Sequence, residues 1–275
     1  MYLNLLEFLF IFFLKFDIFG DCCNLNENKS NNNLKNNSND NLKNKNNDDK
    51  NNNQDDKKDK KEVKNVILLT TGALNPVHKG HIMSLKLAQD YLENKGFVVK
   101  KIYLSPSSDI YLNNKKKSGK IDYFYNFEDR FKMCQLAVED FKKENNGNRY
   151  NIEVSDWEGK QSKFVDFPDV IKHFENDVKN KDKLVFYICG SDHYNNNVKH
   201  SNLDNIIVIK RNTDIVSLEN KKNHFTIVDN DNSDFSSTKA RNLIKKINNN
   251  EDVDNNKKEL EKYLYKSVID CIFSK

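Results

Sequence analysis

The chain has 275 residues, and its 45 Lys plus Arg stand against 41 Asp plus Glu, giving a formal net charge of +4 at pH 7. This balance does not favour a basic nucleic-acid-binding protein, in which positive charge would dominate at least one segment. The length allows one large domain or two small ones, large enough to form a core without disulfides or metals.

The first 23 residues are apolar and aromatic. Their uninterrupted apolar run, residues 8–14, is too short to span a bilayer, and charged residues flank it. A signal peptide would need a positive amino-terminal region and small residues at a cleavage site, which are not evident. A membrane anchor, a targeting segment and a misassigned start of the reading frame are all left open for this segment.

Residues 24–62 contain sixteen Asn, nine Lys and eight Asp plus Glu, with almost no apolar side chains. Such a balanced, polar segment cannot bury enough apolar surface to offset the entropy of ordering. We predict a disordered tail here. The folded domain is expected over residues 63–275, where mixed apolar and polar periodicity begins.

Strands and helices are predicted to alternate through this domain. In chain order they are a strand at 66–71, a helix at 80–93, a strand at 98–104, a loop with the lysine run 115–117, a helix at 127–141, a strand at 150–154, a helix at 165–178, strands at 184–189, 205–209 and 225–228, and helices at 236–247 and 259–273. The alternation predicts a single α/β domain with a mostly parallel sheet and helices on both faces.

Four unusual segments each follow one of the first four strands: GALNPVHKGH, SPSSD, SDWEG and GSDH. Ligands bind beyond the carboxyl ends of the strands in open parallel sheets. The sequence therefore predicts a binding site at this edge, although neither GxxxxGK[ST] nor GxGxxG is present.

The first of these segments fits an anion site. We expect Gly72 to make a sharp turn that Pro76 stiffens, and the next helix to point its amino terminus at the sheet edge. His78 and His81 would lie on one face of the first turn, with Gly80 admitting a phosphate. By themselves two such histidines are more often surface residues, and a zinc site would need a further ligand.

The segment DFSSTKAR begins the helix predicted at 236–247. Ser236 or Ser237 fits a helix N-cap, which by itself would explain the hydroxyl residues. Hydroxyls followed by Lys239 and Arg241 also fit a second anion site, and the two interpretations are compatible.

GALNPVHKGH and DFSSTKAR together resemble the HxGH and SSTxxR signatures of the nucleotidylyltransferase superfamily. SPSSDIY with its following lysines, FEDRFKMCQLA, VSDWEGKQ and CGSDH make the chain similar to nicotinamide/nicotinate mononucleotide adenylyltransferases, from about residue 65 onward. The resemblance implies a Rossmann-like nucleotidylyltransferase fold. It also implies transfer of AMP from ATP to the mononucleotide in NAD biosynthesis, with release of pyrophosphate.

The resemblance also implies roles for individual residues. His78, His81 and Arg241 would be catalytic, holding the ATP phosphates. Nucleotide or substrate contacts would come from Gly72, Ala73, Asn75, Trp157 (stacked on the pyridine ring), Gly190, Asp192, Ser236, Ser237, Thr238 and one of Lys115, Lys116 and Lys117.

Simpler interpretations stand beside these roles. Trp157 could be a core or edge residue, Asp192 could be a helix N-cap, and the lysine run could be a solvated loop. Ala73 also departs from the family, which usually has Ser or Thr there. The complete HxGH matches bacterial relatives, whereas many animal enzymes differ at the first His.

The implied substrates are ATP, with Mg²⁺ on its triphosphate, and a pyridine mononucleotide. We expect no resident metal and no nucleic-acid partner. Membrane association is not favoured, although the apolar amino-terminal segment is left unexplained, and homo-oligomerisation is left open. ATP use and five scattered cysteines without a CxxC pair favour the cytoplasm or nucleus, with Cys134 and Cys189 buried. The alternatives are phosphopantetheine adenylyltransferase, a phosphoalcohol cytidylyltransferase or a non-catalytic nucleotide-binding module.

Overall fold

The computed structural model describes residues 64–145, 147, 149–211, 213–218, 223–229 and 234–274. The apolar segment 1–23 and the disordered tail 24–62 predicted above lie outside these residues. Within them, no helix combines the length and the apolar character needed to cross a membrane.

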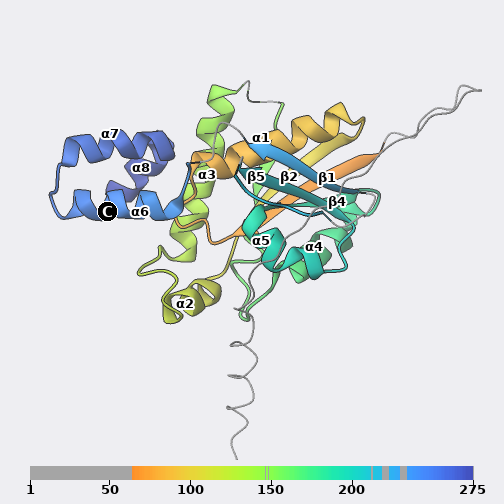
Figure 1. Ribbon diagram of the computed structural model, residues 1–275, viewed down its shortest axis with the longest axis horizontal. Coiled ribbons are helices and arrows are strands. Elements are labelled where there is room, and N and C mark those ends of the chain that lie inside the picture. Colours follow the sequence, from red (N-terminus) through yellow and green to blue (C-terminus); the bar gives the residue numbers. More distant parts are fainter. Residues whose placement is uncertain are drawn as a thin grey trace, which may run out of the picture. The chain divides into compact units, whose positions relative to one another are not determined.

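A parallel sheet forms the centre of the described part (Figure 1). Its strands follow the order β3-β2-β1-β4-β5-β6, and every neighbouring pair is parallel. The order reverses between β1 and β4, which is where such sheets open a crevice at the carboxyl ends of the strands. The strands are β1 (Asn65–Gly72), β2 (Val98–Pro106), β3 (Ile152–Val154), β4 (Leu184–Gly190), β5 (Asn205–Arg211) and β6 (Asn223–Asp229).

Both faces of this sheet are covered by helices, as predicted (Figure 1). Along β1, Val66 and Leu68 belong to one buried apolar cluster, and Ile67 and Leu69 to another. This alternation follows from the two-residue period of a strand. The first cluster includes α1 (Lys79–Asn94), α3 (Phe127–Glu144) and α6 (Ser237–Asn248), and the second includes α4 (Phe167–Asn176) and α5 (Ser191–Asn196).

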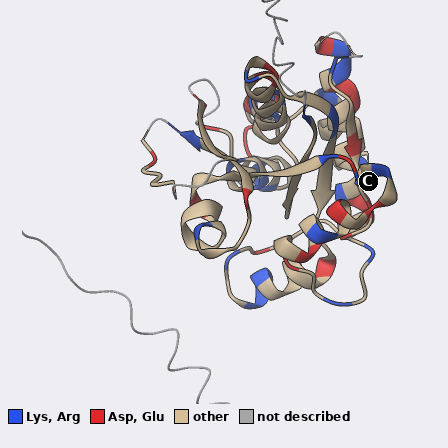
Figure 2. Cartoon of the chain, turned by 90° about the vertical axis from the view of Figure 1, so that its right-hand side faces the viewer, with Lys and Arg blue, Asp and Glu red and all other residues tan. Residues whose placement is uncertain are grey.

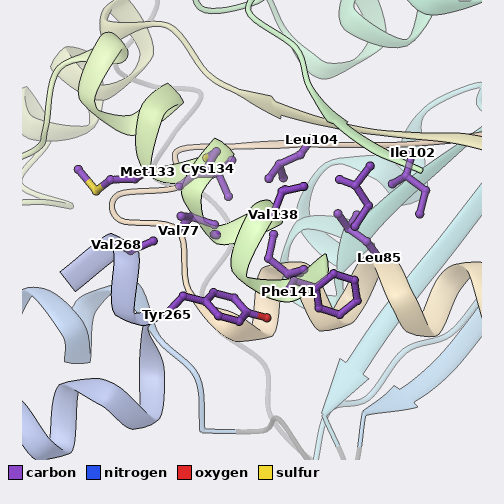
Figure 3. Packing of buried hydrophobic residues seen from close by; sticks show 14 of the residues in the cluster. Val77, Leu85, Ile102, Leu104, Met133, Cys134, Val138, Phe141, Tyr265 and Val268 are labelled. Atoms are coloured by element: carbon purple, nitrogen blue, oxygen red, sulfur yellow. The ribbon is translucent and has the colours of Figure 1, made fainter. Parts of the chain in front are cut away.

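Helix α3 lies between the sheet and the carboxyl-terminal helices (Figure 3). Its buried Cys134 and Phe141 pack in the same cluster as Leu104 of β2 and Val268 near the carboxyl terminus. Burial raises the pKa of the Cys134 thiol to about 12, so this cysteine is an inert apolar residue, as predicted.

The single helix predicted at 259–273 is wrong. The chain forms α7 (Val253–Tyr263) and α8 (Lys266–Phe273), separated by Leu264 and Tyr265 in extended conformations. Both linking residues are buried, and a straight helix could not bury them while also placing α8 against α3. The carboxylate of Asp140 on α3 fixes the second helix by accepting from the Ser267 backbone N–H at 3.0 Å and its hydroxyl at 2.9 Å.

The loop predicted around residues 115–117 is also wrong, because these lysines form the last turn of α2 (Asp109–Lys117). Asp109 in the first turn and the lysines in the last turn complement the helix dipole. Only Leu112 is buried, so the helix has no apolar periodicity by which to recognise it. The remaining predicted strands and helices are confirmed with small shifts at their ends.

Charged residues of both signs are interspersed over the described helices and loops (Figure 2). Arg130 of α3 is a charged residue whose side chain is fully buried. Its guanidinium donates to the carbonyl oxygens of Tyr125 and Ala73, both at 2.9 Å, and to the Asp109 carboxylate at 2.8 Å. One side chain therefore joins α3 to the segments that follow β1 and β2.

Replacing Arg130 with Leu should destabilise the protein by about 3–5 kcal/mol, because two partly buried carbonyls and the Asp109 carboxylate lose their donor. Chemical denaturation measures the free energy of unfolding. Arg149→Leu is the matched control, since Arg149 is half-exposed and pairs with Asp90 and Glu93 on the surface. It should cost about 0–1 kcal/mol. Equal losses in the two variants would contradict the proposed role of Arg130.

Candidate active site

The turn between β1 and α1 brings the HxGH segment to the carboxyl edge of the sheet. Leu74 makes this turn, with a φ of 45°. Gly72 continues β1 to its last residue, where its carbonyl accepts a hydrogen bond from the Ser107 backbone N–H at 2.9 Å. The predicted turn-forming role of Gly72 is therefore wrong.

His78 and His81 form a stacked pair at the start of α1. Their ring centroids are 3.6 Å apart, with 22° between the planes. His78 is the N-cap, and its backbone N–H donates to Nδ1 of His81 at 3.0 Å. Because Nδ1 accepts this bond, the neutral His81 ring carries its proton on Nε2.

Both histidines are neutral near pH 7. Burial lowers the pKa of His81 to about 4. Burial, followed by the neighbouring His81 and Arg211, holds the pKa of His78 well below 6.5. In the ligand-free chain these rings therefore act as neutral hydrogen-bonding groups, and a bound polyanion would raise both pKa values.

Gly80 is explained by a protein neighbour. A Cβ built on it would lie 2.8 Å from Cβ of Phe235 and 3.2 Å from Cε1 of His78. The glycine therefore allows Phe235 to pack on the first turn of α1, where its ring stacks with that of His78 at 6.1 Å. Gly80 also lines the cavity described below, and the expected room for a phosphate stays a prediction.

A cavity of about 320 Å³ opens at the carboxyl ends of β1, β4 and β5, and we call it the histidine cavity. His78, His81, Gly190 and Asp192 line it, so these four predicted site residues are brought together. Asp192 lies in the first turn of α5 and Gly190 is the N-cap, so the alternative of an Asp192 cap is wrong. The other lining residues include Thr70, Thr71, Gly80, Ser84, Lys210, Arg211, Asp214, Asp229 and Phe235.

A second cavity, of about 280 Å³, lies beside the first, and we call it the lysine cavity. Of the three candidate lysines only Lys115 lines it, with Nζ 5.0 Å from the ring centroid of Tyr111. Lys116 and Lys117 are exposed and line neither cavity. The remaining lining residues include Gly72, Ala73, Ser107, Glu158, Phe164, Asp166 and Phe167.

The two cavities share part of their walls. Thr71, Tyr187 and His193 line both of them. Thr71 is at the end of β1, and Tyr187 is on β4, so the junction lies where the strand order reverses. Two ligands, one in each cavity, would meet at this point.

Arg241 does not line either cavity. Its side chain is buried, with Nη1 donating to the Asn75 carbonyl at 2.9 Å and Nη2 to the Thr238 hydroxyl at 3.2 Å. Arg241 thus holds the loop that precedes α1. Its Nε is buried with no hydrogen-bond partner among the described residues, and its predicted phosphate contact stays a prediction.

The two serines of the SSTKAR segment also make their hydrogen bonds within the protein. Ser236 is the N-cap of α6, and its hydroxyl accepts from the backbone N–H groups of Thr238 and Lys239. Ser237 donates to the Pro76 carbonyl at 2.9 Å. The N-cap interpretation is confirmed, and the second anion site, which is compatible with it, stays a prediction.

Asn75 and Trp157 also lie outside both cavities. The buried Asn75 amide donates to the Tyr123 carbonyl and accepts from the Tyr125 backbone N–H, both at 3.0 Å. Trp157 stacks on His173 of α4, with centroids 3.8 Å apart and planes 5° apart. One face of this indole is thus already covered.

A buried carboxylate in the lysine cavity was missed by sequence reasoning. Glu158 accepts hydrogen bonds from the hydroxyls of Thr71, at 2.5 Å, and Ser105, at 2.8 Å. Burial raises the pKa of Glu158, while these hydroxyl donors oppose the rise. It follows Trp157 directly, but nothing in SDWEG distinguishes a site carboxylate from a surface one.

Lys210 and Arg211 were missed as well. They end β5 and line the histidine cavity. Both residues directly follow the strand predicted at 205–209. The rule that ligands bind beyond the carboxyl ends of strands therefore also predicts them as site residues. Among the described residues, no group of three or more His, Cys, Asp and Glu is placed to hold a metal ion.

Comparison with known proteins identifies a family and several relatives. The model of the cytidylyltransferase-like family matches residues 69–243. The nicotinamide/nicotinic acid mononucleotide adenylyltransferase of Arabidopsis thaliana is 30% identical over 135 residues, covering 46% of this chain and 49% of that protein. Nicotinamide/nicotinic acid mononucleotide adenylyltransferase 2 of Xenopus tropicalis is 34% identical over 116 residues, covering 42% and 33%. The chain spans about half the length, or less, of these curated relatives.

A solved structure supports the fold. The Plasmodium falciparum nicotinic acid mononucleotide adenylyltransferase complexed with NaAD aligns with a TM-score of 0.55 and 19% identity, over 77% of this chain and 95% of that chain. The predicted Rossmann-like nucleotidylyltransferase fold is confirmed by this likeness and by the parallel sheet.

Gly80→Ala should destabilise the protein by about 1–3 kcal/mol, because the added methyl group would overlap Phe235. Alanine has a higher helix propensity than glycine, so a loss of stability would be due to the steric overlap. Gly72→Ala is the matched control, since a Cβ there meets nothing within 4 Å. Thermal unfolding of both variants measures the difference, and an unchanged Gly80→Ala would refute the packing argument.

Proposed function

Because the chain belongs to the cytidylyltransferase-like family, we propose that it is an adenylyltransferase acting on nicotinamide or nicotinate mononucleotide. It would transfer AMP from ATP, giving NAD or its deamido form and pyrophosphate, in NAD biosynthesis. The names of its relatives support this choice. The observation that carries it is the pair of cavities with a shared wall, since the reaction joins two nucleotides end to end.

ATP is assigned to the histidine cavity. His78 and His81 line it from the start of α1, and Arg211 lines it from the end of β5. They provide hydrogen-bond donors and positive charge for phosphates. Gly190 and Asp192 lie at the end of β4, where a backbone without a side chain and a carboxylate suit a ribose. This arrangement fits a nucleoside triphosphate better than an uncharged ligand.

The mononucleotide is assigned to the lysine cavity. Lys115 provides a cation for one phosphate. Tyr111 and Phe164 line the same cavity with ring centroids 6.0 Å apart, and Phe164 is 49% exposed. A cation beside accessible aromatic rings matches a ligand with one phosphate and one flat heterocycle.

The reaction in this arrangement is an in-line displacement. A phosphate oxygen of the mononucleotide forms a bond to the α-phosphorus of ATP, and the bond to the bridging oxygen of the β-phosphate breaks, so pyrophosphate leaves. Chemistry of this kind depends on positioning and charge stabilisation. His81 would donate its Nε2 proton in a hydrogen bond to the phosphates, because Nδ1 is already occupied.

Mg²⁺ is proposed to enter with ATP, held mostly by phosphate oxygens and water, as its ligand preference suggests. We also propose a cytoplasmic or nuclear location. ATP is available there, and Cys134, Cys189 and Cys271 are free thiols, as expected in a reducing compartment.

His81→Ala should lower kcat by about 10²–10³-fold, the effect of removing one transition-state donor. His200→Ala is the control, since His200 is exposed on the short helix Val198–His200. Pyrophosphate release is measured with ATP and either pyridine mononucleotide. Release only with CTP and phosphocholine would overturn the proposed substrates, and full activity of His81→Ala would overturn its role.

Lys115→Ala should raise KM for the mononucleotide by about 10-fold or more, since a hydrogen bond to a charged group is lost. KM for ATP should stay unchanged. Lys117 is exposed and lies two residues further along the same helix, so Lys117→Ala should match the wild type. Equal effects of the two substitutions would contradict the assignment of the lysine cavity to the mononucleotide.

A further inference from the structure

His193 belongs to the junction between the two cavities, and the function proposed above gives it no role. It is on α5, three residues after Gly190, and this residue lines both cavities. It is the only histidine that does so among the described residues, because His78 and His81 line the histidine cavity alone.

The protonation of this ring is set by a neighbour. The Asn197 side-chain amide nitrogen lies 3.2 Å from Nδ1 of His193. An amide nitrogen only donates, so Nδ1 accepts, and the neutral ring carries its proton on Nε2. Burial lowers the pKa of His193, which keeps the ring neutral near pH 7.

The Nε2 proton has no acceptor. Nε2 is buried and has no hydrogen-bond partner among the described residues. Buried donors in native proteins are nearly always paired, and an exception calls for an explanation. A ligand oxygen at the junction would supply the missing acceptor.

The surroundings of His193 point to the ligand of the lysine cavity. The charged groups that act on its ring are Asp166 and Lys115, and its edge packs on Phe167 at 4.9 Å between centroids. All three line the lysine cavity, and none lines the histidine cavity.

We propose that His193 is a substrate-binding residue whose Nε2–H donates to a non-reacting phosphate oxygen of the bound mononucleotide. This inference rests on the proposed function, because the acceptor phosphate must lie at the junction to reach the α-phosphorus of ATP. Lys115 and His193 then hold that phosphate from two sides. The same phosphate is thereby directed toward the histidine cavity.

Isothermal titration calorimetry on the full chain tests this without turnover, each ligand being titrated alone. The ligands are nicotinamide mononucleotide, nicotinate mononucleotide, ATP and nicotinamide riboside, which lacks the phosphate. The variants are His193→Leu, which removes the donor, and His193→Gln, which retains an N–H near the Nε2 position. His200→Leu is the matched control on an exposed histidine, and thermal unfolding confirms that each variant folds.

For His193→Leu we expect affinity for the mononucleotides to fall by about 10-fold or more, as for a lost hydrogen bond to a charged group. Affinity for ATP and for the riboside should not change. His193→Gln should recover much of the loss, and His200→Leu should match the wild type.

Wild-type affinity for the mononucleotides in His193→Leu would overturn the inference while leaving the proposed function intact. An equal loss for the riboside would overturn the phosphate contact. A wild-type chain that binds neither mononucleotide and forms no dinucleotide from ATP would overturn the proposed function, and this inference with it.

Discussion

Two buried arginines fix the loop on which the candidate site is built. Arg130 donates to the Ala73 carbonyl and Arg241 to the Asn75 carbonyl, so helices α3 and α6 hold the same short segment. Asn75 in turn binds the backbone of Tyr123 and Tyr125 through its side chain. Burying a guanidinium is costly unless it is hydrogen-bonded, so these contacts favour one geometry of the loop. Three donors of Arg130 and two of Arg241 are paired in this way, whereas Nε of Arg241 has no hydrogen-bond partner among the described residues. That geometry places His78 at the start of α1.

Fixing the loop determines the chemical state of the histidines. Because His78 caps α1, its backbone N–H is free to bind Nδ1 of His81, which leaves Nε2 as the donor. Phe235 packs over Gly80 and helps to bury the pair, and burial keeps both rings neutral. The positive charge of the histidine cavity therefore comes from Lys210 and Arg211 at the end of β5, while the histidines contribute directed hydrogen bonds. Positioned neutral donors suit a reaction in which charge moves between phosphate groups.

Sequence patterns were sufficient for the sheet and for the edge where the cavities lie, because buried strands are continuous apolar runs and parallel strands place their carboxyl ends together. They could not show side-chain direction. The SSTKAR pattern predicts a helix cap and an anion site equally well. The contacts of Ser236 and Arg241 are needed to show the cap and the link to the loop before α1. The choice of Lys115 over its neighbours depends on α2, a helix with one buried residue. Trp157 could be placed after a strand, but its partner His173 is distant in sequence and follows no local pattern.

Under the proposed function, the position of Trp157 bears on which side chains would contact the acceptor ring. Trp157 has one indole face on His173 and lines neither cavity, so the more accessible aromatic rings are those of Tyr111 and Phe164 in the lysine cavity. Glu158 and Asp166 also line this cavity, so a ring bearing a carboxylate would meet two acidic side chains where a carboxamide would meet potential acceptors. Repulsion between like charges costs more as the surroundings become drier. Burial raises the pKa of Glu158, and the hydroxyls that bind this carboxylate oppose the rise, so their loss would favour the neutral acid at the wall of the lysine cavity.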